Sequence, residues 1–196
     1  MKTLETNDWM ILNSIIYKIY TTEDADIMRE QFLEQMKMVL DFDSADFFLA
    51  DSQESKHLVR PVTYNCDDES PMCDEMNADR GIVYSGKSLV YRETDMISDE
   101  KRVQTEYYQK VYRPNNWHYA IQMILGRNKE FLGVVTFYRT IGKDNFQYDD
   151  IFILDMLKDH LAFRLYKDGQ QKDERAEKLT ITEVTEKYEL TKREHT

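Results

Sequence analysis

Two runs of strand-forming residues, Trp117–Leu125 and Phe131–Arg139, are separated by only five residues in the second half of the chain. The intervening segment, 126–130, opens with a glycine and contains an asparagine, and this length and chemistry are typical of a β-hairpin loop. A hairpin makes neighbouring strands antiparallel, so the two runs exclude a sheet built only of parallel βαβ units.

Helical patterns flank this hairpin on both sides. Near the N-terminus, apolar residues spaced by three or four predict one helix over Trp9–Tyr20 and a second that starts from Thr22 as N-cap and ends near Asp41. The stripe of the first helix consists of Trp9, Leu12, Ile16 and Ile19, with Ile11 and Ile15 beside it. After the hairpin, Asp149 or Asp150 is a suitable cap for a closing helix, whose stripe consists of Leu154, Leu157, Leu161 and Leu165.

Shorter segments complete the expected fold. Ala45–Ala50 and His57–Tyr64 have strand character, and Pro61 in the second lacks a ladder N–H, which predicts an edge or bulged strand. Asn65–Arg80 is acidic and rich in turn formers, which indicates an exposed loop. Asp99–Tyr112 is expected to be a helix that a following proline stops. This order of elements predicts the α+β class, with an antiparallel sheet flanked by helices.

Charge and composition limit the possible functions. Of 196 residues, 37 are acidic and 26 are Lys or Arg, so the net charge is −11, which repels the phosphate backbone of nucleic acids. With 41% hydrophobic residues, the chain can form one compact domain with a short extension. The apolar runs fall far short of the ~20 residues of a membrane span, and the N-terminus has no export pattern. We therefore expect a cytoplasmic protein without membrane contact.

Gly81–Ser88 fits the phosphate-loop pattern GxxxxGK[ST]. That chemistry requires a buried strand before the loop and a helix N-terminus after it, so that backbone N–H groups point at the phosphates. Residues 76–80 make no buried strand, and Leu89–Tyr91 are strand formers rather than helix formers. We interpret the match as a turn at Ser85–Gly86 between two short strands.

The sequence offers no metal or catalytic set. Cys66 and Cys73 are separated by six residues rather than the two to four typical of a zinc pair, and no histidine lies near them in sequence. The four histidines are scattered, and no GxSxG or HExxH signature supplies a catalytic partner. We therefore expect no metal site, no catalytic residue and no enzymatic activity.

Aromatic side chains are concentrated between residues 107 and 119. Amphipathic rings around a hollow suit a small organic ligand, because each hydroxyl or indole N–H can orient it, although packing within a core explains the same composition. The candidate ligand-binding residues are Tyr107, Tyr108, Tyr112, Trp117, His118 and Tyr119. The sequence identifies no cofactor, and the partner it predicts is a small molecule of unknown identity.

Taken in order, these elements resemble a GAF domain, a small-molecule-binding and signalling module. Three segments carry the resemblance: the glycine, turn and strand of 81–90, the glycine-containing strand of 131–139, and Phe146 followed by Asp149 and Asp150. The resemblance covers about residues 10–168. It implies a GAF/PAS-like antiparallel sheet flanked by helices, and a sensor domain over residues 1–168.

The last residues resemble a second family. Leu190–Glu194 is similar to the Leu-Thr-x-Arg-Glu opening of a LuxR-type helix-turn-helix domain. This implies a transcription regulator in which residues 169–189 are a linker or an extended signalling helix and 190–196 are the incomplete start of the DNA-binding domain. DNA would be contacted only through that domain, and ligand would rearrange a homodimer formed by the helices Trp9–Tyr20 and Asp149–Lys167.

Two other functions fit the same fold. A cysteine-based reductase of the GAF type, such as a free methionine sulfoxide reductase, would use Cys66 and Cys73, although the acidic residues around them raise the pKa of a thiol. A domain that only dimerises or docks to a protein would bind no ligand and have a packed interior.

Overall fold

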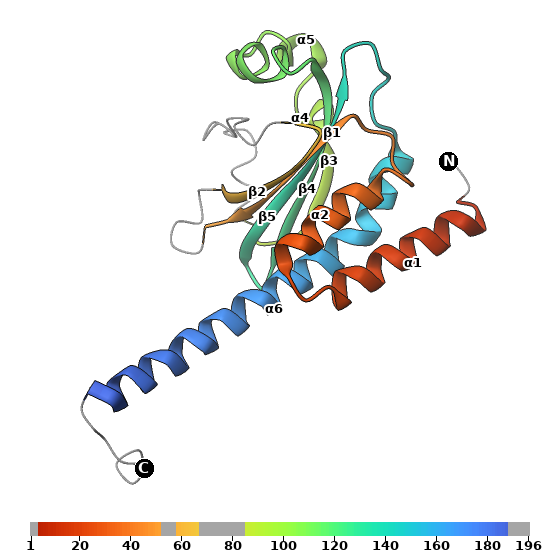
Figure 1. The fold of residues 1–196 in the computed structure, drawn as a ribbon. Helices are drawn as coiled ribbons and strands as arrows, with labels where there is room; N and C mark the ends of the chain where they lie inside the picture. The colour runs from red at the N-terminus through yellow and green to blue at the C-terminus, as the bar shows by residue number, and fades with distance from the viewer. Residues whose placement is uncertain (1–3, 52–57, 67–84, 188–196) are drawn as a thin grey trace.

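A five-stranded antiparallel sheet forms the centre of the molecule (Figure 1). The computed structural model describes residues 4–51, 58–66 and 85–187, with side chains described up to residue 172. The strand order is β2-β1-β5-β4-β3, and every neighbouring pair is antiparallel. The strands are β1 Ser44–Ala50, β2 Leu58–Tyr64, β3 Leu89–Arg92, β4 Trp117–Arg127 and β5 Glu130–Thr140. The predicted α+β class, with an antiparallel sheet flanked by helices, is confirmed.

The β4–β5 hairpin confirms the strongest sequence prediction but has a tighter connection. Both strands extend beyond the predicted runs, and Arg127 pairs with Glu130, so that only Asn128 and Lys129 form the turn. These two residues have φ values of 52° and 68°, as a type I′ turn requires. The predicted five-residue loop is therefore wrong in length, because the strand ladder continues past Gly126.

Strand β2 is both an edge strand and irregular, as Pro61 predicted. It lies at the end of the strand order, and its pairing with β1 shifts between Phe47 and Leu49. Arg60, just before the proline, has a φ of 52°, which bends the strand at this point. Proline at an edge removes no ladder hydrogen bond from the centre of the sheet.

Helices α1 (Thr6–Thr21), α2 (Ala25–Met36) and α6 (Tyr148–Lys187) lie on one face of the sheet (Figure 1). The N-cap of α2 is Asp24 rather than the predicted Thr22, because Asp24 Oδ1 accepts the amides of Asp26 and Ile27 at 2.8 and 2.9 Å. Thr22 instead terminates α1 by donating its amide to the carbonyl of Lys18.

The buried stripe of α1 differs from the predicted one at its start. Leu12, Ile15 and Ile19 are buried, whereas Trp9 is 50% exposed. The prediction also placed Ile16 on this stripe with Ile15 beside it, but Ile15 is the buried residue and Ile16 is only partly buried against the core. Trp9 thus adds to the exposed apolar surface of α1.

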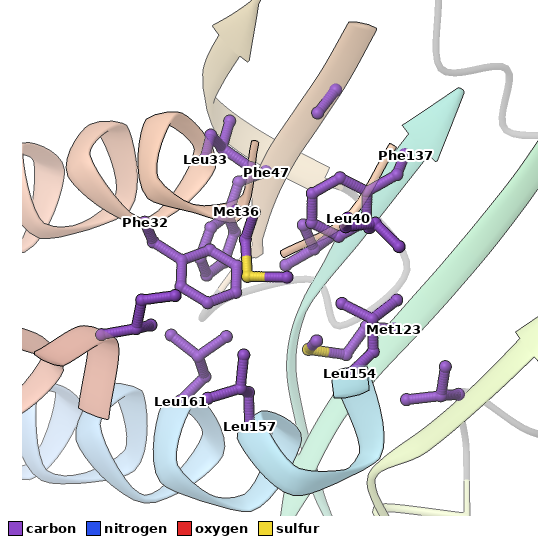
Figure 2. Close-up of a cluster of buried hydrophobic side chains, with 14 of the residues drawn as sticks. Phe32, Leu33, Met36, Leu40, Phe47, Met123, Phe137, Leu154, Leu157 and Leu161 are labelled. Atoms are coloured by element: carbon purple, nitrogen blue, oxygen red, sulfur yellow. The ribbon is translucent and has the colours of Figure 1, made fainter. Parts of the chain in front are cut away.

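The main core lies between these helices and the sheet (Figure 2). Met123 and Phe137 point from β4 and β5 toward the helices, and the predicted stripe of α6 is buried against them. That stripe consists of Leu154, Leu157, Leu161 and Leu165. Each fully buried side chain of this kind contributes about 1.5–3 kcal/mol. Helix α6 is therefore held to the sheet along its first half.

The start of α6 differs slightly from the prediction. The helix begins at Tyr148, and Asp150 lies inside its first turn, where its carboxylate accepts the amide of Gln147 at 2.7 Å. Asp149 and Asp150 are thus first-turn acids rather than caps, positions in which a carboxylate interacts favourably with the helix dipole.

The predicted helix over Asp99–Tyr112 is broken into two short pieces. These are α5 (Asp99–Arg102) and the π-helix η1 (Tyr108–Tyr112), and α4 (Glu93–Met96) precedes them. Thr105 causes the break, because its hydroxyl donates to the carbonyl of Arg102 at 2.7 Å and accepts the amide of Tyr108 at 3.1 Å. Such side-chain bonds compete with continuous helix. We call residues 93–112 the α4–η1 segment.

Several sequence predictions lie outside the described residues. They include most of the acidic loop 65–80, Cys73, and the segment 190–196. Among the helices that the structure does describe, none is both long enough and apolar enough for a membrane span.

Candidate ligand-binding site

All six candidate ligand-binding residues come together at one end of the sheet. Tyr107, Tyr108 and Tyr112 come from η1 and the residue before it, and Trp117, His118 and Tyr119 begin β4. Their rings form an unbroken series of contacts, with centroid separations of 4.3–6.1 Å. That they contact a ligand stays a prediction.

Part of this group forms a second core on the sheet face opposite α1, α2 and α6. Trp117 stacks on Tyr138 with ring centroids 3.9 Å apart and planes 9° from parallel. Tyr112 packs edge-on against both rings, at 6.1 and 5.8 Å, and is buried like them. Aromatic pairs of this kind add about 0.5–1.5 kcal/mol each beyond burial. Tyr138 is a member of the cluster that the sequence did not reveal.

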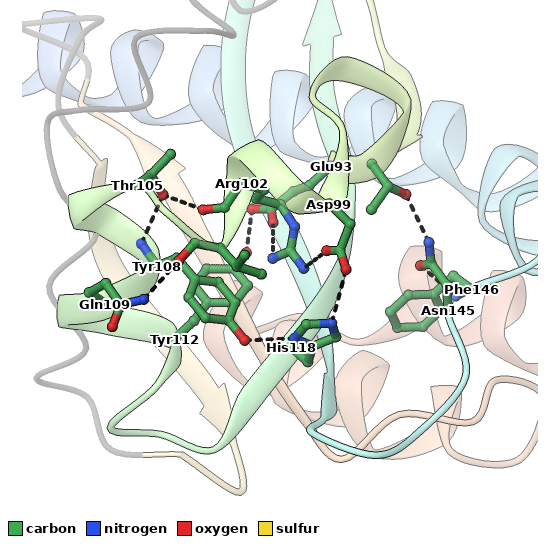
Figure 3. A network of polar contacts seen from close by, with 12 residues as sticks. Glu93, Asp99, Arg102, Thr105, Tyr108, Gln109, Tyr112, His118, Asn145 and Phe146 are labelled. Atoms are coloured by element: carbon green, nitrogen blue, oxygen red, sulfur yellow. Dashed lines mark hydrogen bonds and ion pairs between the residues drawn. The ribbon is translucent and has the colours of Figure 1, made fainter.

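Arg102 connects the α4–η1 segment to this cluster (Figure 3). Its guanidinium carbon lies 5.1, 5.6 and 5.7 Å from the ring centroids of Tyr108, Tyr112 and Tyr119. Arg102 is the one buried residue of α5, and α4 has none. The contact of a cation with aromatic rings is worth about 2 kcal/mol when desolvated, so Arg102 helps to hold these two short helices.

Acidic side chains complete the surroundings of Arg102. Its Nη2 donates to Asp99 at 2.6 Å, and its Nη1 lies 3.4 Å from Glu93 Oε2. The hydroxyl of Tyr112 donates to the other oxygen of Glu93. Burial, and then the negative charge of Glu93, raise the pKa of Tyr112 well above its ordinary value, so Tyr112 stays a neutral donor.

His118 links the two sides of this network. Its Nδ1 lies 2.6 Å from the hydroxyl of Tyr108, and its Nε2 lies 3.4 Å from Asp99 Oδ2 (Figure 3). Asp99 thus contacts Arg102 with one oxygen and faces His118 with the other. The sequence singled out His118 but gave no sign of Arg102 as its neighbour, because the two meet only through Asp99 and Tyr108.

Asp46, in the middle of β1, is the most unusual polar residue on this face. It is 1% exposed, and its Oδ2 accepts the hydroxyl of Tyr138 at 2.7 Å. Its Oδ1 is buried and has no hydrogen-bond partner among the residues that the structure describes. Burial raises the pKa of Asp46 to about 7, although the hydrogen bond from Tyr138 and the polar groups of Thr136 oppose this rise.

Asp46 belongs to a row of polar residues that crosses the whole sheet. Directly paired residues of neighbouring strands point to the same face. Thr63 pairs with Asp46, Asp46 with Thr136, Thr136 with Gln122, and Gln122 with Tyr91. The hydroxyl of Tyr91 donates to Gln122 at 2.6 Å. We call these five residues the polar row.

Apolar clusters border the polar row on both sides. The aromatic cluster of Trp117, Tyr138 and Tyr112 lies on one side, and a smaller cluster that includes Phe48, Ile124 and Val134 lies on the other. Burial of polar groups is unfavourable unless hydrogen bonds compensate for it. A few polar groups between apolar walls are the usual composition of a small-molecule site.

Other motifs of the sequence have structural roles in the described ranges. The strand β3 follows Ser88, whose hydroxyl donates to the carbonyl of Gly126 at 3.0 Å, so the second half of the GxxxxGK[ST] match leads into a strand and lacks the helix that phosphate binding needs. The thiol of Cys66 donates to the carbonyl of Ala45 at 3.3 Å. No three His, Cys, Asp or Glu side chains are grouped as metal ligands within those ranges.

One groove lined by described residues lies away from the aromatic cluster. It has a volume of about 570 Å³ and runs between the end of α1 and helix α6, where Tyr20, Glu23, Phe163 and Lys167 line it. None of the six candidate residues borders it. Its walls carry both signs of charge and are open to solvent, so they select for no particular ligand.

The comparisons with known proteins agree on the fold. No protein-family model and no curated protein sequence matches the chain. Among solved structures, the GAF domain of a phosphoenolpyruvate-protein phosphotransferase from Coxiella burnetii is similar, with a TM-score of 0.61 and 14% identity over 84% of this chain and 96% of that one.

Two further solved structures have the same architecture. Free methionine-R-sulfoxide reductase from Neisseria meningitidis, in complex with its substrate, has a TM-score of 0.57 and 16% identity over 87% of this chain and 96% of its own. The phycocyanobilin-bound GAF domain of a cyanobacterial phytochrome has a TM-score of 0.60 and 10% identity over 86% and 98%. Sequence identities of 10–16% establish similarity of fold only. The chain has the fold of the GAF domains.

Proposed function

We propose that this chain is the small-molecule-sensing domain of a cytoplasmic LuxR-type transcription regulator, and not an enzyme. The observation that carries the proposal is the largely buried polar row, which lies beside an aromatic cluster on the face of the sheet that α6 does not cover. In this proposal the ligand contacts Tyr107, Tyr108, Tyr112, Trp117, His118 and Tyr119. Two structural neighbours are described with a bound bilin or a bound substrate, which supports a ligand-binding role.

The path of the signal follows from the two faces of β4. Gln122 of the polar row lies on the ligand side, whereas its neighbours Ile121 and Met123 pack in the core beneath α6. A ligand that prefers one position of β4 therefore changes the position of α6 that packs best. Because α6 leads toward the segment 190–196, this helix is the natural route to a DNA-binding domain.

A homodimer is the second part of the proposal. Helices α1 and α6 expose large apolar side chains, which in a monomer contact water: Trp9, Met10, Tyr17, Tyr20, Tyr148 and Phe152. An apolar surface of this kind commonly marks an interface. A second copy of the chain would cover these residues and place two α6 helices, and thus two DNA-binding domains, at a fixed spacing.

A thermal-shift screen of metabolites tests the sensor function. A ligand that binds only the native state at a hundredfold excess over Kd adds about 2.7 kcal/mol to the free energy of unfolding. We expect at least one class of compound to raise Tm by several degrees, and light scattering to give the mass of a dimer. If no metabolite raises Tm, and the chain is a monomer at high micromolar concentration, the proposal is wrong.

A cysteine-based reductase remains the alternative function, because one structural neighbour is a reductase and Cys66 packs beside the aromatic cluster. Its activity would need both Cys66 and Cys73. If the double change Cys66→Ser and Cys73→Ser leaves ligand binding unchanged, and the original chain does not reduce methionine sulfoxide, the reductase is excluded. A module that only docks or dimerises would give a dimer in light scattering and no hit in the screen.

A further inference from the structure

Asp46 is an acid whose negative charge is not balanced. Among the described residues, no Lys, Arg or His side chain contributes to its electrostatics, and its partners are Tyr138 and Thr136, both of them neutral groups. Two arginines, Arg29 and Arg102, also have a buried nitrogen without a partner, but their other nitrogens bind carboxylates and carbonyls. Asp46 therefore differs from every other buried ionisable group in the described core.

The nearest cation on this face is already paired. Arg102 contacts both Glu93 and Asp99, and Glu93 also accepts the hydroxyl of Tyr112. With Asp46, this network has three acidic side chains and the guanidinium of Arg102, and Arg113 adds a further positive charge near Tyr108. A positive charge bound here would be balanced, whereas a bound anion would face an excess of negative charge.

We propose that the sensor recognises a cationic small molecule, an amine or guanidine with an apolar body, through an ion pair with Asp46 Oδ1. This inference rests on the proposed sensor function and specifies its ligand class. The N–H groups of such a ligand supply the hydrogen bond that Oδ1 lacks, and charge-assisted bonds of this kind are among the strongest in proteins. The aromatic cluster supplies the apolar wall for the ligand's body.

The polar row adds a second requirement on the ligand. Neighbouring strands lie about 4.8 Å apart, so Gln122, two strands from Asp46, is about 10 Å away along the row. Thr136 lies between them. A ligand that lies along the row would therefore bear its charged nitrogen at one end and a polar group within about 10 Å of it, at the Gln122 amide.

Entry of the ligand requires the cover of Asp46 to move. Tyr138 bonds to Asp46 and packs against Tyr112 of η1, so the described cover on this side is the α4–η1 segment. Its first two helices contribute one buried side chain, Arg102, and are otherwise held by hydrogen bonds such as those of Glu93 with Tyr112 and of Thr94 with Asn145. The π-helix η1 is a form often found at functional sites. Opening of this segment would expose Arg102 and the three buried residues of η1, and would leave the main core closed.

The groups that titrate near Asp46 are limited. Tyr138 bonds to it from β5, Tyr107 and Glu93 act on Tyr138 from farther away, and Cys66 lies two residues after β2. The pKa of Tyr138 is raised well above its ordinary value by burial and then by the Asp46 charge, so it stays protonated. Asp46 is thus a group whose ionisation an amine ligand would sense.

Calorimetry and thermal shift with charge-matched probes test the inference. One set shares a phenyl ring: phenethylamine, benzylguanidine, 2-phenylethanol and 3-phenylpropanoate. A second set shares a butyl chain: butylamine, butylguanidine, butanol and pentanoate. Each probe is titrated into the unaltered chain, into Asp46→Asn and into Asp43→Asn. Asp43 is the matched control, because its carboxylate already bonds to Thr140 and Lys143 outside the row.

We expect the cationic members of at least one set to bind at least tenfold more tightly than the alcohol and the carboxylate. Asp46→Asn should abolish this preference while Asp43→Asn keeps it, with circular dichroism confirming that both fold. Because a proton competes with the amine for Asp46, the affinity should fall about tenfold per pH unit below pH 7 and level off above it.

Three outcomes overturn the inference. Neutral or anionic probes that bind the original chain and Asp46→Asn alike would leave the sensor function intact but exclude a cationic ligand. Amine binding that Asp46→Asn does not weaken would assign the charge preference to other residues. If none of the eight probes binds, the cationic ligand class is excluded, and the sensor function stands or falls with the wider metabolite screen.

Discussion

The guanidinium of Arg164 in α6 donates a 2.6 Å hydrogen bond to the carbonyl of Ile19, near the end of α1. The same side chain donates to the carbonyl of Glu23 at 3.0 Å and to the carboxylate of Asp168 at 2.9 Å. Arg164 is buried, so these bonds attach the α1–α2 connection directly to the helix proposed to transmit the signal.

Replacing Arg164 by alanine should destabilise the protein markedly. The change leaves the carbonyls of Ile19 and Glu23 without their donor, and we expect a loss of about 3 kcal/mol in the free energy of unfolding. Urea denaturation followed by circular dichroism measures it. Lys110→Ala is the control, because its ion pair with Glu106 is exposed and contributes little to stability. Equal losses for the two variants would contradict the role given to Arg164.

Arg102→Ala should loosen the α4–η1 segment without unfolding the main core. The change removes the cation from between Tyr108, Tyr112 and Tyr119 and takes the balancing positive charge from Glu93 and Asp99, so we expect a loss of about 2–4 kcal/mol. Hydrogen exchange should accelerate in residues 93–112 while the amides of β5 stay protected. Uniform acceleration throughout the protein would show that the segment does not open separately. Arg102→Lys keeps the charge and should lose less.

Asp46 should make the protein less stable as the pH rises. Its pKa is about 7 in the fold and about 3.9 in an unfolded chain, so the native state holds a proton that the unfolded state releases between these values. Below about pH 4, Asp46 is protonated in both states and does not reduce the free energy of unfolding. Above about pH 7, its ionisation lowers the free energy of unfolding by an amount on the order of 4 kcal/mol.

The isosteric change Asp46→Asn separates this effect from other titrations. We expect the variant to be more stable than the original chain at pH 8 and to lose this pH-dependent advantage progressively down to about pH 4, when both are compared by urea denaturation. A difference between the two that is the same at every pH would show that Asp46 does not titrate in this range.

Two glycines with positive φ provide a matched pair of substitutions. Gly86 has a φ of 61°, and a Cβ built on it would lie 2.2 Å from the Cα of Lys129 in the hairpin turn. Gly142 has a φ of 95° and no atom within 4 Å of the same position. Gly86→Ala should therefore cost more than about 3 kcal/mol and Gly142→Ala about 1 kcal/mol, measured as the loss in free energy of unfolding. Similar losses would contradict the close approach of the Gly86 turn to the hairpin.

Elements with local signals were the ones that could be predicted from the sequence. The β4–β5 hairpin and the leucine stripe of α6 follow from periodicity within a single segment, and the irregular edge strand follows from Pro61. The helix over Asp99–Tyr112 could not be predicted correctly, because the hydroxyl of Thr105 bonds to the backbone on both sides and interrupts an otherwise helical pattern.

The candidate site shows a different limit. The aromatic residues 107–119 are close in sequence, so their grouping was visible there. The polar row draws Asp46, Gln122 and Thr136 from three strands, and their alignment depends on a register that no local pattern specifies. Arg102 was missed for the same reason, since its burial depends on rings that come from η1 and β4.

The length of α6 gives small movements of the sheet a large effect at a distance. The helix has 40 residues, and the part after Gly169 spans about 27 Å at 1.5 Å per residue. A tilt of about 5° in the half held by the leucine stripe would displace the far end by about 2 Å, if the backbone stays straight. Gly169 lies between the half of α6 that packs on the sheet and the half that extends beyond it. Because glycine has no side chain, α6 bends most easily at this residue. The change Gly169→Ala would make α6 stiffer at this point without altering the aromatic cluster or the polar row.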